Sequence, residues 1–118
     1  VIEAHDPIEF PFPSLEAIAD LLYTTGTTGM PKGVALSFRN LSAAANNINS
    51  FIKNTSEDIE LLALPISHSF GLGRLRCVLS VGGTLVLLGS FASMKKFYGE
   101  MERCKVTGFG MVQLVGLI

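Results

Sequence analysis

Short apolar segments alternate with longer amphipathic segments from residue 18 onward, and this alternation constrains the fold more than any other feature. Residues 84–88 (TLVLL) are continuously apolar, as in a strand buried on both faces, whereas residues 38–53 repeat their apolar positions at helical spacing. Along the whole chain, these two patterns predict both strands and helices. The expected strands are 18–24, 34–36, 59–64, 84–88 and 106–112, and the expected helices are 38–53, 70–81 and 94–104.

The order of these elements predicts the fold class. Strands that alternate with helices of this length imply an α/β fold: β-loop-β followed by βαβαβ units, in a mainly parallel sheet with flanking helices and right-handed crossovers. In open sheets of this kind, ligands bind at the carboxyl ends of the strands. Two loops follow strands here, one within residues 23–33 and one at 65–71, and both are candidate binding segments.

Capping residues support the predicted helix boundaries. Ser37 and Ser93 each stand directly before a helical pattern, where serine is a favoured N-cap. Gly82 and Gly83 follow the second helix, and glycine commonly ends helices. The first helix should therefore begin at residue 38, the second should end near residue 81, and the third should begin near residue 94.

The helical patterns also predict which side chains face solvent. Three asparagines lie off the apolar stripe of the first helix and are expected to form a solvated face: Asn46, Asn47 and Asn49. Four apolar residues of the second helix are expected to point inward: Leu72, Leu75, Val78 and Leu79.

The composition predicts that this chain is part of a larger domain. Of its 118 residues, 48% are hydrophobic and only 16% are charged. A small complete domain buries less of its surface than a large one and needs more polar residues. Residues 1–14 are acidic, hold three prolines and are expected to form an irregular arm. We therefore place a partial domain at residues 15–118.

Charge, cysteines and hydropathy argue against several classes of function. The net charge of −1 gives no reason to expect nucleic acid or an anionic membrane as a partner. Cys77 and Cys104 form neither a CxxC motif nor a metal-ligand pattern, so we expect two reduced thiols, a cytoplasmic location and no metal site. No apolar run approaches the ~18 residues of a membrane span.

The glycine-rich stretch between the first two predicted strands has the chemistry of an anion-binding loop. Residues 23–33 read YTTGTTGMPKG. Glycines allow the backbone to approach a ligand, and consecutive N–H groups in such loops bind anions. Threonine hydroxyls and the Lys32 ammonium add donors and a positive charge, which suits a polyphosphate. From composition alone, a mobile glycine-rich surface turn is an equal alternative.

This loop is not the common P-loop. That motif, GxxxxGK[ST], leads directly into a helix. Here Lys32 lies between Pro31 and Gly33, and a strand is expected next. The residues therefore predict a different phosphate loop or a plain surface turn.

The residue order resembles the adenylate-forming superfamily, which includes acyl-CoA synthetases. Residues 23–34, YTTGTTGMPKGV, resemble its signature phosphate loop, T-[ST]-G-T-T-G-x-P-K-G. Three further segments resemble later family motifs in the right order: LALPISHSFGL at 62–72, VGGTLVLL at 81–88 and KKFYGEMERCKVTGFGMV at 95–112. The resemblance spans about residues 20–112 and implies part of the family's large N-terminal domain.

The resemblance implies an activity. Family members activate a carboxylic acid with ATP to an acyl-adenylate, and most then transfer the acyl group to the thiol of CoA or a carrier protein. Magnesium would accompany ATP. The loop would close over the β- and γ-phosphates and hold them through seven residues: Thr24, Thr25, Gly26, Thr27, Thr28, Gly29 and Lys32. The family's catalytic lysine comes from a later domain, so Lys32 is interpreted as a phosphate-loop charge.

His68 is the candidate catalytic residue. As a lone histidine it would be a loop residue with no task, but the resemblance places it where the substrate carboxyl and the thiol tunnel meet. Amino-acid-activating relatives resemble FDxS here, with an aspartate for the substrate's amino group, whereas this chain has His68. An unpaired ammonium in that pocket would be costly, so we expect a fatty, aryl or other simple acid. Phe70 and Gly71 are expected to shape the same pocket.

Some residues depart from the family pattern, and other functions stay open. Arg74 and Arg76 lie in a segment that is apolar in the family; they are expected either at a solvent boundary or in a salt bridge to parts of the enzyme outside this chain. Gln113 stands where the family often has proline. We expect this chain alone to lack turnover and to self-associate. The alternatives are a non-catalytic nucleotide-binding or phosphate-binding module and a structural subdomain of an assembly.

Overall fold

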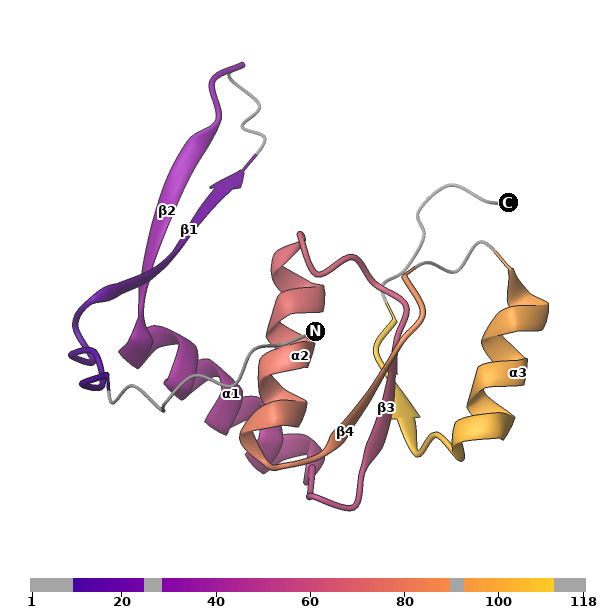
Figure 1. The fold of residues 1–118 in the computed structure, drawn as a ribbon. Helices are drawn as coiled ribbons and strands as arrows, with labels where there is room; N and C mark the ends of the chain where they lie inside the picture. The colour runs from indigo at the N-terminus through magenta and orange to yellow at the C-terminus, as the bar shows by residue number, and fades with distance from the viewer. Residues whose placement is uncertain (1–9, 25–28, 90–92, 112–118) are drawn as a thin grey trace, which may run out of the picture. The chain divides into compact units, whose positions relative to one another are not determined.

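The computed structural model describes residues 10–24, 29–89 and 93–111. The chain forms two compact units, one up to Leu41 and one from Ser42 onward. The described elements follow the predicted order from β1 to β5 (Figure 1). Residues 10–14 contain neither helix nor strand, and the division of the chain at residues 14 and 15 stays a prediction.

The first unit contains a β-hairpin. Strand β1 (Ile18–Thr24) pairs in antiparallel fashion with β2 (Lys32–Ser37), and the two form a separate two-stranded sheet. β2 starts two residues before the predicted 34–36, because its pairing continues to Thr24 opposite Lys32. Helix α1 (Phe38–Ile52) follows β2 directly.

Hydrogen bonds confirm the predicted helix starts. The backbone N–H of Asn40 donates to Ser37 Oγ at 3.2 Å, and the Asn40 side chain accepts from the backbone N–H of Ser37 at 3.0 Å. Such a reciprocal pair satisfies donors that the first turn leaves open. Ser93 Oγ likewise accepts from the backbone N–H of Lys96 at 3.3 Å. Gly82, with φ +75°, adopts the left-handed conformation just after the second helix.

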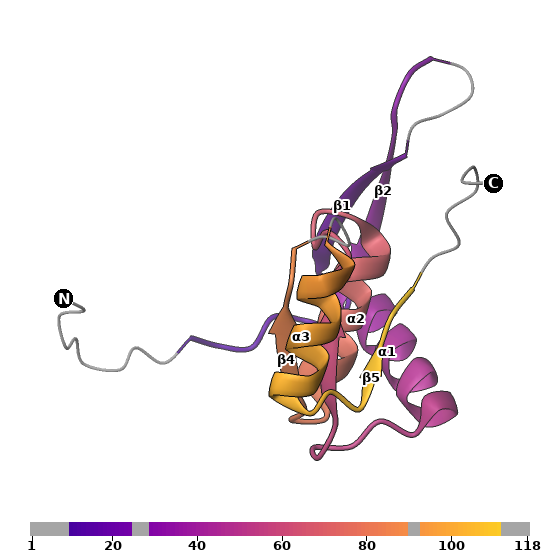
Figure 2. The ribbon, with the colours of Figure 1, turned by 90° about the vertical axis from the view of Figure 1, so that its right-hand side faces the viewer.

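The second unit contains a three-stranded parallel sheet. Its order is β4 (Thr84–Leu87), β3 (Ile59–Leu62) and β5 (Gly108–Phe109), with β3 in the centre. Helices α2 (Ser69–Ser80) and α3 (Met94–Cys104) lie on opposite faces of this sheet, as Figures 1 and 2 show. The predicted α/β class with flanking helices is confirmed. The strands are shorter than predicted, and residue 112 lies outside the described residues.

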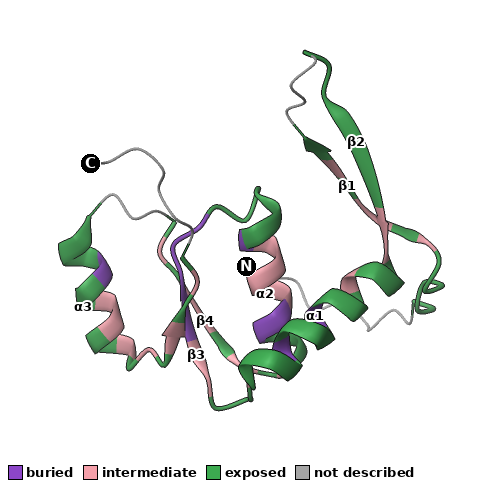
Figure 3. Ribbon diagram, turned by 180° about the vertical axis from the view of Figure 1, so that it is seen from behind, coloured by how far each residue is buried: buried purple, intermediate pink, exposed green. Residues whose placement is uncertain are grey.

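Alternating side chains on β3 give each helix its own packing surface. Leu61 on β3 and Ala63 just after it point toward α3 and form a buried cluster with its Phe97. Glu60, the neighbour of Leu61 on the opposite face, contacts α2 through Arg74. Figure 3 shows buried residues concentrated along β3 and on the sides of the helices near it. β3 therefore fixes where both helices lie.

Asn49 does not belong to a solvated face, and this prediction was wrong. The residue is only 8% exposed, and its amide donates to the carbonyl of Cys77 at 2.9 Å and to Ser80 Oγ at 3.0 Å. Its own oxygen accepts from the Asn54 amide at 3.0 Å. A buried amide with satisfied donors and acceptor is stable where an unpaired one would not be. Asn46 is exposed as predicted.

Leu79 was also assigned wrongly, because it is 57% exposed. Val78 is buried as predicted, and Leu72 and Leu75 are half-buried. Asn47 is exposed, as expected.

Both cysteines are free thiols. Cys77 is buried, and burial raises the pKa of its thiol. Cys104 is only partly buried. Within the described residues, no helix has the length and apolar character needed to cross a membrane.

Candidate functional site

Strand pairing holds the two ends of the glycine-rich loop together. Thr24, the last residue of β1, lies opposite Lys32, the first residue of β2. The Thr24 hydroxyl donates to the Lys32 carbonyl at 3.5 Å, and both residues are exposed. Gly29 has a φ of +85°, which side chains with a Cβ rarely adopt, and a Cβ there would meet nothing within 4 Å. The pairing of Thr24 with Lys32 therefore fixes the two ends of the loop.

Four of the predicted phosphate-binding residues lie outside the described residues. They are Thr25, Gly26, Thr27 and Thr28. Gln113 lies outside the described residues as well. The structure thus brings together Thr24 and Lys32, and the phosphate-binding roles of all seven loop residues stay predictions.

His68 caps helix α2 at the carboxyl end of β3. Its backbone is extended (φ −101°, ψ 143°), and its Nδ1 accepts a hydrogen bond of 3.4 Å from the backbone N–H of Phe70. A ring nitrogen that accepts carries no proton, so in this arrangement the neutral ring has its proton on Nε2. The side chain is exposed. His68 can therefore present an N–H donor outward while its other nitrogen holds the helix start.

Gly71 lets the first turn of α2 pack against the chain that leaves β3. A Cβ at this buried position would lie 2.3 Å from the carbonyl oxygen of Pro65 and 3.2 Å from that of Leu64. No real Cβ approaches backbone so closely, so any other residue would push the helix away. The structure gives Gly71 a packing role, and its place in a substrate pocket stays a prediction.

Phe70 lies beside the segment that follows β5. A Cβ at Gly110 would be 3.2 Å from the Phe70 ring and 3.4 Å from Cγ of Arg74. Phe70 is 40% exposed. His68 follows the carboxyl end of β3 and Gly110 that of β5, so both stand at the edge where ligands bind in parallel sheets. The sequence patterns did not single out Gly110.

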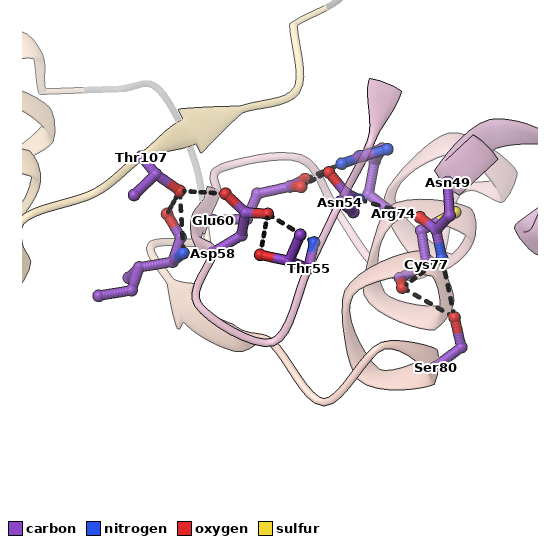
Figure 4. A network of polar contacts seen from close by, with 10 residues as sticks. Asn49, Asn54, Thr55, Asp58, Glu60, Arg74, Cys77, Ser80 and Thr107 are labelled. Carbon is purple, nitrogen blue, oxygen red and sulfur yellow. Dashed lines mark hydrogen bonds and ion pairs between the residues drawn. The ribbon is translucent and has the colours of Figure 1, made fainter. Parts of the chain in front are cut away.

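A buried ion pair joins α2 to β3. Arg74 Nε donates to Glu60 Oε1 at 2.8 Å, and Arg74 Nη2 pairs with Glu60 Oε2 (Figure 4). The side chains are 13% and 6% exposed, respectively. The hydrogen bond to Glu60 raises the pKa of the Arg74 guanidinium. Both expectations for Arg74 were therefore wrong, because its partner lies within this chain and away from solvent.

The sequence contains a signal for this pair that was missed. Glu60 interrupts the apolar run IELLAL, and a carboxylate in a central strand needs a partner. Arg74 interrupts an apolar helix in the same way. Arg76 is half-buried, and both expectations for it stay open.

A second polar cluster ties together the amino ends of β3 and β5. The Asp58 carboxylate accepts from the backbone N–H of Thr55 at 2.7 Å and from the Thr107 hydroxyl at 3.0 Å (Figure 4). The bond from Thr55 and, to a smaller extent, the bond from Thr107 lower the pKa of Asp58. A pocket of about 280 Å³ adjoins the cluster and is lined in part by Glu60 and Arg74.

The described residues hold no group of three or more His, Cys, Asp or Glu side chains that fits a metal ion. The Lys32 ammonium at one end of the loop is a donor that suits phosphate oxygens.

Comparison with known proteins decides the family. A model of the AMP-binding enzyme family matches residues 3–114. The chain belongs to the AMP-binding enzyme family. These adenylate-forming proteins are the superfamily that the motifs at residues 23–34, 62–72 and 81–88 predicted, and that prediction is confirmed.

Relatives in this family are CoA ligases. The chain is 39% identical over 114 residues to 2-succinylbenzoate–CoA ligase of Bacillus subtilis, covering 94% of this chain and 23% of that protein. Two structures of o-succinylbenzoate CoA synthetase from Bacillus subtilis, one with ATP and a magnesium ion and one with an acyl-adenylate intermediate, match with a TM-score of 0.78. Each is 37% identical to this chain, and each match covers 85% of this chain. The match covers 21% of the chain in the structure with ATP and 26% of the chain in the structure with the acyl-adenylate.

This match extends to the fold of the family's N-terminal domain. The chain spans only 16% to 23% of the length of the curated relatives it matches. The family and its fold are thus shown over most of this chain, while the activity of a whole protein is a matter for proposal.

Proposed function

We propose that this chain is part of a longer acid–CoA ligase and contributes its phosphate loop and one wall of its acid site. The carboxylate of the substrate would attack the α-phosphorus of ATP, giving an acyl-adenylate and releasing pyrophosphate. The CoA thiol would then attack the acyl carbonyl and displace AMP. A carrier-protein thiol is the alternative acceptor.

One observation carries this proposal: the loop YTTGTTGMPKG has its ends fixed by the pairing of Thr24 with Lys32, inside a chain of the AMP-binding family. Negative charge grows on the departing pyrophosphate, and donors already aimed at it lower the barrier. The Lys32 ammonium and the loop residues Thr25, Gly26, Thr27, Thr28 and Gly29 would supply those donors, and the Thr24 hydroxyl would join them by giving up its bond to the Lys32 carbonyl. Mg²⁺ bound to ATP would share the charge.

The second unit would contribute the acid site. His68 presents its Nε2 proton at the carboxyl edge of the sheet, where it can donate to the substrate carboxyl or its acyl oxygen. Phe70 would line the same wall, and Gly71 would let α2 approach. No acid stands at position 68 to pair with an amino group, so the substrate is a fatty, aryl or other simple acid.

The test is carboxylate-dependent exchange between ATP and pyrophosphate in the full-length protein, measured against a panel of simple acids. The K32A variant should lose most of this exchange by weakening contact with the phosphates. K95A removes an exposed lysine of α3 and is the matched control, expected to keep the wild-type rate. Equal exchange in K32A and wild type would reject the phosphate role of Lys32.

The non-catalytic alternative has a distinct outcome in the same experiment. A protein that binds ATP but shows no acid-dependent exchange would be a non-catalytic nucleotide-binding module. The 118-residue chain alone is proposed to lack turnover and to self-associate, which exchange assays and sedimentation would test. A cytoplasmic location is likewise proposed, to be tested by fractionation.

A further inference from the structure

We propose that Glu60 and Arg74 form a positioning pair, which sets the place of α2 on β3 and thereby the positions of His68 and Phe70. Neither charged residue touches substrate in this proposal; both act through the residues at the start of the helix. The inference rests on the acid–CoA ligase function proposed above, because it assigns His68 and Phe70 to the acid site.

The contact between the two side chains has a defined geometry. Arg74 uses Nε and Nη2 on the two oxygens of one carboxylate, with the Nε bond at 2.8 Å. A planar guanidinium bound at two points fixes orientation as well as distance, which apolar contacts do not. Both side chains are largely buried, which strengthens the attraction between them relative to an exposed pair. The pair therefore resists sliding or rotation of α2 along β3.

The pair is linked directly to Phe70. Arg74 follows Phe70 by one helical turn, so the two side chains share a face of α2. The Phe70 ring and the Arg74 stem both lie against Gly110, at 3.2 Å and 3.4 Å from where its Cβ would be. A shift of the guanidinium would carry the stem, the ring and the first turn of the helix with it.

His68 lies at the end of the same rigid element. It precedes Arg74 by six residues, which is about 9 Å along a helix that rises 1.5 Å per residue. Its ring is tied to the helix by the bond from Phe70 N–H to Nδ1. Gly71 allows close contact with Pro65, but a glycine supplies space and no direction. Of the described contacts between α2 and β3, the ion pair is the one that fixes the orientation of the helix.

Stability alone does not account for such a pair. Desolvation offsets much of the attraction between buried charges, and apolar replacement of both partners is often neutral or stabilising. Removing one partner leaves a buried charge and is strongly destabilising. A double apolar variant therefore separates geometry from stability, whereas a single neutralising variant does not.

The experiment compares E60L/R74M with wild type in the full-length protein. We expect the double variant to keep its melting temperature and to lose about tenfold to a hundredfold in kcat/KM for the acid, as misplaced catalytic groups do. The rate at which diethyl pyrocarbonate modifies His68, followed by mass spectrometry, should also change. E100Q/R103Q removes the exposed ion pair of α3 and is the control, expected to change neither value.

Each outcome decides the matter. A folded E60L/R74M protein with wild-type kcat/KM and wild-type His68 modification would overturn the proposal, as would equal changes in the control. If the wild type has no acid-dependent activity but His68 modification still differs in E60L/R74M, positioning stands and the ligase function fails. If the double variant does not fold, the same two measurements are made on R74K. This variant keeps the positive charge but lacks the planar guanidinium that binds both carboxylate oxygens.

Discussion

Asn49 on α1 donates a hydrogen bond of 2.9 Å to the backbone carbonyl of Cys77 on α2. The amide also reaches Ser80 Oγ at 3.0 Å, and its oxygen accepts from Asn54. One buried side chain therefore joins a helix, the last turn of its neighbour and the loop that leads into β3. The first prediction concerns this junction.

We expect N49A to lower the free energy of unfolding by about 1–3 kcal/mol, because the substitution leaves a buried carbonyl and amide with fewer partners. N46A, which changes an exposed asparagine of the same helix, should have little effect. Urea unfolding of the full-length variants, followed by circular dichroism, measures both. A shift in N46A as large as that in N49A would show that the junction is not special.

Gly71 and Gly73 make a matched pair within α2. G71A should destabilise the protein by about 1–3 kcal/mol or more, which is the usual cost of overpacking. The new Cβ would lie 2.3 Å from the Pro65 carbonyl oxygen. G73A meets nothing within 4 Å and should stabilise the helix by about 0.5–1 kcal/mol. Differential scanning calorimetry of both variants gives the comparison. Similar melting temperatures for the two would contradict the close approach of α2 to Pro65.

The two tasks assigned to His68 can be separated by substitution. H68A removes the cap and should cost about 0.5–1 kcal/mol of stability, whereas H68N keeps a capping oxygen and should cost less. Both variants lack the outward Nε2 donor and should form the CoA thioester more slowly. Thermal unfolding and a thioester assay distinguish the two effects. Full activity in both H68A and H68N would mean that the imidazole does nothing beyond capping.

Local patterns predicted the order of elements because their causes are local. The serine caps at residues 37 and 93 and the left-handed Gly82 act within a few residues of themselves, and the structure has all three. The three strands of the parallel sheet are shorter than predicted for a different reason: β5, for example, pairs with β3 only at Gly108 and Phe109. The length over which two strands pair depends on the neighbouring strand. The periodicity within one segment carries no information about that neighbour.

Side chains with distant partners were harder to predict. On a helix with 3.6 residues per turn, Asn49 lies only about 40° from Ala45 of the apolar stripe. The burial of Asn49 could therefore have been predicted from the helical pattern. Arg74 required knowing that β3 brings Glu60 beneath α2, which is a tertiary fact. The assignment of Thr24 and Lys32 to one loop came from residue order, and strand pairing then explained why they lie together.

The last prediction is a pH dependence of stability that comes from Asp58. Hydrogen bonds from the Thr55 N–H and the Thr107 hydroxyl hold the pKa of this carboxyl below its ordinary value of 3.8. The unfolded chain therefore binds a proton more readily than the folded one, and stability rises with pH in that range. The contribution of Asp58 is fully present above pH 3.8 and is lost as the pH falls below that value toward the folded pKa.

D58N tests this sign directly. Asparagine keeps an acceptor of the same shape but carries no charge, so the variant should be less stable than wild type at pH 7, and the difference should shrink below pH 3.8. Urea midpoints at several pH values follow the difference. E57Q alters a neighbouring exposed carboxylate and is measured beside D58N as the control. A difference between D58N and wild type that stays constant from pH 7 to pH 3 would mean that the two threonines do not favour the charged carboxylate.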